Sequence, residues 1–173
     1  MRGRLDDFTD QVRQSEQGRG ARARILDGPL DEYAVVLEDR GWLVARLEPR
    51  AGQGLRELIV DALQLPVADL VRPNAPSRVA AATEALQRFA RPVLDARSTG
   101  TCPPGEDPHL EDDLHELLLT LVKAAAAEGV GIALLIERAS DLSATGLGGI
   151  FTLAAGAQTA SWPLHVILSG LRT

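Results

Sequence analysis

The chain has 173 residues, of which 45% are hydrophobic and 24% charged, and its net charge is -6. This length suits one domain that buries roughly two-thirds of its unfolded surface, and a single cysteine, Cys102, excludes an intramolecular disulfide. No apolar run approaches the roughly 20 residues that cross a bilayer, and the first residues lack a signal peptide, so we expect a cytoplasmic protein with no membrane partner.

Two helices and two strands are predicted in the first part of the chain. Apolar residues at helical spacing predict an N-terminal helix within residues 1 to 20. A short strand follows at 21 to 26 and stops at the turn signal Asp27-Gly28-Pro29. A second helix then leads into a strand at 42 to 47. A strand, a helix and a second strand this close together predict a short parallel crossover.

The middle of the chain is predicted to be mainly helical. A helix from Leu55 closes at Pro66, and residues 66 to 76 hold three prolines that predict a stiff connection. Ser77 suits the N-cap of a helix that runs to about residue 90. Residues 95 to 108 are rich in Ser, Thr, Pro and Gly, and we expect a mobile surface loop there.

The last third of the chain alternates helix and strand again. A long amphipathic helix is predicted at 109 to 128, and a strand follows at 130 to 136. A further helix at about 144 to 159 leads to a strand at 164 to 168. This alternation predicts an α/β fold, a three-layer α/β/α parallel sheet of about four strands. We expect residues 1 to 173 to form a single domain.

The strand at 130 to 136 ends abruptly in the charged residues Glu137, Arg138 and Asp141. Its continuous apolar run predicts burial on both faces, as in a parallel sheet. Ligands of open parallel sheets bind outside the carboxyl ends of the strands. The end of this strand is therefore the first candidate for a functional site.

The chain resembles bacterial ATPases of the AAA+ type, related to the origin-recognition and Cdc6-like group. The resemblance rests on the order of elements, on Gly3-Arg4, and on the segments ILDGP at 25 to 29, DEYAVVLEDRGWLVARLEPRAGQGLRELI at 31 to 59, LLIERASDL at 134 to 142 and PLHVILSGL at 163 to 171. It implies a P-loop NTPase-like sheet of strand order 5-1-4-3-2, with ATP and Mg²⁺ as ligands. A nucleic-acid partner is implied by the resemblance alone.

The phosphate-binding loop of that family is missing from this chain. Such a loop supplies backbone N–H groups to the phosphates, a lysine to the β and γ groups, and a hydroxyl to Mg²⁺. Here Gly28 and Pro29 match the start of the loop, and the chain continues at once with Leu30-Asp31-Glu32. Lys123, the only lysine, lies in the long helix predicted at 109 to 128. We therefore expect no cofactor, and Gly28 and Pro29 are interpreted as a remnant.

The second motif of the family is altered as well. In a gap-free alignment, Glu137 takes the place of the Asp that organises Mg²⁺, and Arg138 that of the glutamate that activates water. Glutamate can still bind a hard cation, whereas arginine cannot act as a general base. A shifted alignment makes Glu137 the catalytic glutamate and deletes the Asp. Solvated residues at a strand end explain the same pattern equally well. Ser169 falls at the sensor position after the last strand, or simply terminates that strand.

Two further candidates have simpler structural interpretations. His109, Asp112, His115 and Glu116 fit a solvated acidic helix start better than a metal site, because the histidines are six residues apart. His165, inside the last strand, is expected to be a packed histidine.

These observations lead to two main hypotheses. The first is a degenerate AAA+ ATPase-like domain that does not hydrolyse ATP, and serves as an interaction or regulatory module or is a decayed ATPase. The second is a functional ATP-binding ATPase whose phosphate site is non-standard or completed by a partner. An unrelated doubly wound enzyme is a third reading. The chain stops before the family's fifth strand, so we expect the strand at 22 to 27 to be an exposed edge that binds a protein partner or a second copy.

Overall fold

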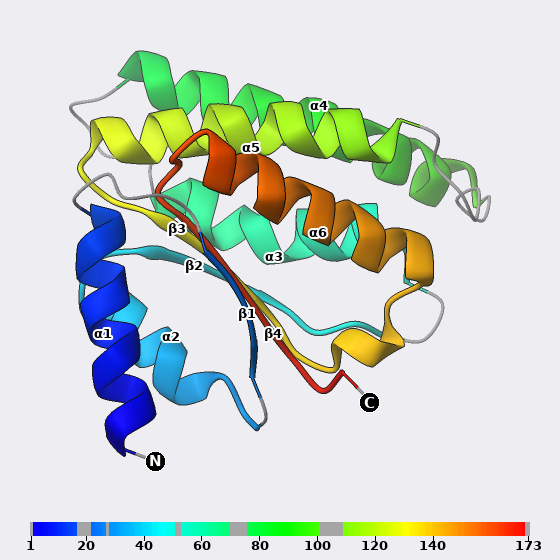
Figure 1. Cartoon of the computed structure of the whole chain (residues 1–173). Helices are drawn as coiled ribbons and strands as arrows, with labels where there is room; N and C mark the ends of the chain where they lie inside the picture. The colour runs from blue at the N-terminus through cyan, green and yellow to red at the C-terminus, as the bar shows by residue number, and fades with distance from the viewer. Residues whose placement is uncertain are drawn as a thin grey trace.

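The computed structural model describes residues 2–16, 22–26, 28–50, 53–69, 76–100 and 109–171 (Figure 1). Within these residues the chain forms six α-helices, one 3₁₀ helix and four strands. In chain order they are α1 (Arg2–Glu16), β1 (Arg22–Leu26), α2 (Asp31–Glu38), β2 (Leu43–Leu47), α3 (Leu55–Asp69), α4 (Pro76–Thr99), α5 (Leu110–Ala127), β3 (Ile132–Ile136), η1 (Ala139–Asp141), α6 (Ala144–Thr159) and β4 (Leu164–Ser169).

The four strands form one parallel sheet in the order β1-β4-β3-β2. This confirms the predicted α/β class and gives these strands the relative order that we expected. All residues of β3 and β4 are buried, as their apolar runs predict for central strands. β1 and β2 form the two edges of the sheet.

Helices cover both faces of the sheet (Figure 1). α1 and α2 lie on one face, whereas α3, α5 and α6 lie on the other and α4 packs over α3 and α5. Within β3, Ala133 and Leu135 join the core under α1 and α2, while Ile132, Leu134 and Ile136 join the larger core on the opposite face. Since successive side chains of a strand point to opposite faces, one apolar run supplies two separate cores.

A cluster of aromatic rings fills the core under α1 and α2. The ring of Phe8 lies 5.0 Å from that of Tyr33 and 5.9 Å from that of His165, and the Trp42 and His165 rings are 4.9 Å apart. His165 is fully buried, which confirms the prediction of a packed histidine. Gly131 lies directly under Trp42, because a Cβ at residue 131 would come within 2.5 Å of the indole ring.

One charged side chain, Arg56 of α3, lies inside the core on the other face and is only 6% exposed. Its Nη2 donates to Asp113 of α5 at 2.5 Å, and its Nη1 donates to the backbone oxygen of Phe89 in α4 at 2.9 Å. The guanidinium also stacks over the Phe89 ring at 4.5 Å. Arg56 therefore joins three helices through one buried cation.

Two helices continue past the residues at which we expected them to end, and each contains a proline. α3 includes Pro66 and runs to Asp69, and α4 includes Pro92 and runs to Thr99. A proline inside a helix removes one hydrogen bond and costs about 3 kcal/mol in isolation. In each helix the next residue is buried, Val67 at 4% and Val93 at 3% exposure. Packing of the continued helix offsets the lost hydrogen bond.

The structure also corrects the loop predicted at 95 to 108. Residues 95 to 99 belong to α4, and residues 101 to 108 lie outside the described residues. Ala96 is buried, and the Arg97 Nε donates to Glu57 of α3 at 3.1 Å. These contacts hold the last turn of α4 against α3, although its composition is typical of a loop.

Candidate functional site at the carboxyl end of the sheet

The sheet has a point at its carboxyl end where the connections diverge to opposite faces. The chain leaves β1 over the face covered by α2, and it leaves β3 over the face covered by α6. In open parallel sheets such a switch point creates the crevice in which ligands bind. The ends of β1, β4 and β3 are therefore the candidate site.

The strand register brings the predicted site residues to this one edge. Ser169 pairs with Leu26 at the end of β1, and Leu168 pairs with Ile136 at the end of β3. Glu137 follows Ile136 and donates its backbone N–H to Leu47 of β2 at 3.0 Å. We had expected Ser169 to follow the last strand. It is instead the last residue of β4, and it is buried.

The connection from β1 to α2 is shorter than a phosphate-binding loop. Only residues 27 to 30 separate β1 from α2, whereas the family's phosphate loop has about eight positions. Leu30 is 1% exposed, and its carbonyl accepts from the N–H groups of Tyr33 and Ala34 at 3.1 and 3.0 Å. The helix thus begins at once, with an apolar side chain anchored in the core. Asp27 lies outside the described residues; Gly28 and Pro29 are exposed.

Two carboxylates occupy the first turn of α2, where an anion would otherwise approach the helix. Asp31 and Glu32 are both exposed and favourably placed for the helix dipole. The Asp31 carboxylate accepts from Arg46 of β2 at 2.7 Å, and this hydrogen bond raises the pKa of Arg46 above its usual value. Arg46 offsets the charge of Asp31, and Glu32 adds a negative charge at the place where an anion would approach the helix.

Arg138 holds the turn after β3 in place. Its backbone is left-handed, with φ of 48°, and its Nη2 donates to the carbonyl of Pro49 after β2 at 2.9 Å. Gly170 packs against this turn, because a Cβ there would lie 3.0 Å from the Cα of Arg138. The Arg138 side chain is therefore engaged towards β2, away from the ends of β1 and β4. A guanidinium has no lone pair with which to activate water at neutral pH.

Two of the residues considered for a metal site, His115 and Glu116, have other contacts. His115 packs against the ring of Trp162 at 5.3 Å, and Glu116 accepts from Arg88 at 2.6 Å. In the described ranges, no group of three or more His, Cys, Asp or Glu side chains is arranged to hold a metal ion.

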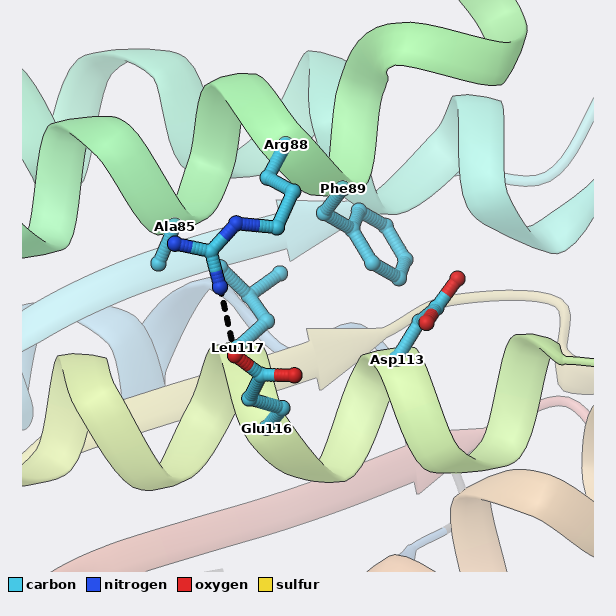
Figure 2. Close-up of a pocket in the computed structure, with 6 residues that line it drawn as sticks. All are labelled: Ala85, Arg88, Phe89, Asp113, Glu116 and Leu117. Atoms are coloured by element: carbon cyan, nitrogen blue, oxygen red, sulfur yellow. Dashed lines mark hydrogen bonds and ion pairs between the residues drawn. The ribbon is translucent and has the colours of Figure 1, made fainter.

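A hollow lies between α4 and α5, away from the ends of the strands. It has a volume of about 70 Å³ and is lined by Ala85, Arg88, Phe89, Asp113, Glu116 and Leu117 (Figure 2). Its charged groups are paired: Arg88 with Glu116, and Asp113 with Arg56. A hollow of this size, with its charges neutralised by ion pairs, is typical of a joint between two helices.

Sequence reasoning placed Glu137, Arg138 and Ser169 at one edge but missed the role of Arg138. No sequence signal indicates that its guanidinium reaches Pro49, because the contact joins segments 89 residues apart. The close approach of Gly170 to Arg138 was missed for the same reason.

Comparison with known proteins adds no assignment. No family model matches the chain, and neither a curated protein nor a solved structure shows significant similarity to it. The chain is thus defined at the level of its fold, an α/β protein with a parallel four-stranded sheet. Among the described helices, none is long and apolar enough to cross a membrane.

Proposed function

We propose that the chain is a degenerate AAA+ ATPase-like domain that does not hydrolyse ATP and that serves as a protein-interaction module. The strand order β1-β4-β3-β2 supports this relationship, because it equals the family order without its fifth strand. The segments that resemble the family also fall where the family needs them: ILDGP leads out of β1, and LLIERASDL spans the end of β3.

The observation that carries the proposal is the short connection between β1 and α2. Phosphate loops bind through a ring of backbone N–H groups, and four residues anchored by buried Leu30 cannot form one. Of the two carboxylates that follow, Asp31 is paired with Arg46, and Glu32 would oppose the charge of a triphosphate. In the gap-free alignment, Arg138 at the end of β3 stands in place of the residue that would activate water.

The open edge of β1 supports an interaction role. Residues of an edge strand keep backbone groups that can pair with another strand, and natural sheets usually cover or charge such edges. Ile25 on this edge is 57% exposed. An edge strand with an exposed apolar side chain offers both backbone and side-chain contacts to an added strand.

A second candidate function is ATP binding completed by a partner. It is favoured by one observation, the retained juxtaposition of Glu137 and Ser169 at the ends of neighbouring strands. In this alternative, a partner would have to supply both the lysine and the backbone donors for the phosphates.

Titration with a fluorescent ATP analogue and Mg²⁺ tests the proposal. We expect no saturable binding below millimolar concentration, which corresponds to less than about 4 kcal/mol of binding free energy. Glu137→Gln is the matched variant, and it should give the same flat titration. Micromolar affinity that is lost in Glu137→Gln would contradict the proposal and favour the alternative.

A further inference from the structure

The helix that covers one face of β1, α6, carries no charged residue. Residues 142 to 171 contain no Asp, Glu, Lys or Arg, although 24% of the chain is charged. This stretch includes all of α6, which lies over the β1 and β4 side of the sheet (Figure 1). The exposed residues of α6 are Ala144, Thr145, Gly148, Phe151, Thr152, Ala155, Gln158 and Thr159. Charged residues are depleted in the same way at the centres of protein interfaces.

Phe151 is the large apolar side chain of this surface, and it lies on the side of α6 away from α5. Gly149 and Gly156 face α5, since a Cβ at either would lie within 4.0 Å of Glu111 or His115. Phe151 follows Gly149 by two positions, about 200° around the helix, so it lies on the side away from α5. α5 packs towards β3, so this side of α6 overhangs β1. Phe151 is 41% exposed there.

The two faces of β1 present different chemistry to an added strand. Ile25 lies on the α6 face, because successive residues alternate and Leu26 packs into the opposite core. Arg24 lies on the α1 face, with its guanidinium 5.9 Å from the centre of the Phe8 ring. An added strand would therefore meet apolar side chains on one face and a cation on the other.

We propose that β1 accepts an extended segment of a protein partner in which apolar residues alternate with acidic ones. This inference rests on the proposed interaction function and names the partner's chemistry. The apolar residues of the segment pack against Ile25 and Phe151, and an acidic residue pairs with Arg24. Backbone hydrogen bonds to β1 extend the sheet by one strand, which is a known mode of peptide recognition.

Charge disfavours a second copy of the chain as the occupant. Antiparallel pairing of two β1 strands about their centre would place the two Arg24 side chains opposite each other, and like charges opposite each other destabilise a sheet. Each copy also carries a net charge of -6. A segment that carries carboxylates opposite Arg24 avoids the local repulsion.

Selection from a displayed library of random peptides of about nine residues tests the inference, since strands usually need only 5–6 residues. We expect enriched peptides in which apolar residues alternate with Asp or Glu, and about a tenfold weaker binding to Ile25→Lys. Arg24→Glu should shift the enrichment from acidic to basic residues at the alternate positions. Leu65→Lys is the matched control; it changes a residue that is 77% exposed on α3, which packs against β2 at the other edge, and it should leave binding unchanged.

Three outcomes would overturn the inference. They are the absence of an enriched pattern, binding that is insensitive to Ile25→Lys, and a dimer in light scattering that Ile25→Lys abolishes. Circular dichroism shows whether each variant is folded, and Phe151→Thr replaces Ile25→Lys if the latter unfolds. Peptides that bind away from β1 would contradict the inference about β1 but not the proposed interaction function. The nucleotide titration tests the proposed loss of ATP binding separately.

Discussion

Arg56 shows how a single residue connects distant parts of the fold. Its cation is buried among α3, α4 and α5, where Asp113 neutralises it and Phe89 supplies both a carbonyl and a ring. A buried charge without a counter-ion is costly. Removing Asp113 would therefore destabilise the contact among α3, α4 and α5 by more than the net attraction between Asp113 and Arg56 contributes. The same logic makes Asp113 more important than the other acids of the first turn of α5.

We expect Asp113→Ala to lower the free energy of unfolding by about 1–3 kcal/mol, because it leaves Arg56 buried without its carboxylate. Asp112→Ala removes a neighbouring acid from the same turn and should cost at most about 1 kcal/mol, the contribution of the helix dipole. Urea denaturation measures both values. Equal losses in the two variants would show that the dipole, and not the pair with Arg56, dominates.

Gly131 offers a test of close packing at the residue scale. A methyl group at this position would overlap the ring of Trp42, so we expect Gly131→Ala to destabilise the fold by about 1–3 kcal/mol. Gly148→Ala is the matched control in α6, where the added Cβ meets open space. It should stabilise the protein by about 0.5–1 kcal/mol through higher helix propensity. Thermal melting should show a lower melting temperature for Gly131→Ala and a higher one for Gly148→Ala. A lower melting temperature for Gly148→Ala would contradict the open space described around Gly148.

At the scale of elements, periodicity predicted the helices and strands well where packing and propensity agree. The predicted helix at 144 to 159 coincides with α6, and the strand at 164 to 168 lacks only Ser169. Prediction failed at Pro66 and at residues 95 to 99, because composition carries no information about burial against a distant helix. Helix ends that depend on tertiary contacts are therefore the least predictable parts of the fold.

The candidate site was only partly predictable for a related reason. The apolar runs that end at Leu26, Ile136 and Leu168 indicate parallel strands, and parallel strands bring their carboxyl ends to one edge. The sequence also showed directly that a phosphate loop is missing. The direction of the Arg138 side chain depends on a left-handed backbone and on a carbonyl after β2, neither of which has a local signal.

At the scale of the whole molecule, the burial of the strands decreases from the centre of the sheet to the edge formed by β1. β3 and β4 are buried along their whole length, whereas β1 pairs on one side only among the strands that the structure describes. Local opening is easiest where few apolar contacts are lost. We therefore expect β1, which we propose to bind a partner, to open more readily than β3 and β4.

Amide hydrogen exchange measures this gradient. We expect the amides of β3 and β4 to exchange slowest, near the limit set by global unfolding, and those of β1 to exchange faster. Addition of a selected peptide should slow exchange in β1 and leave β2 unchanged. Exchange in β1 that is as slow as in β4 without peptide would show that the edge is already covered.

The position of Trp42 has a spectroscopic consequence. Trp42 is buried under α1 and α2, whereas Trp162 packs against the core on the opposite side of the sheet. The two indoles of the chain therefore report on different layers, and replacing either by phenylalanine leaves a fluorophore that follows one layer alone. Comparing their emission during denaturation would reveal whether the two cores melt together or one after the other.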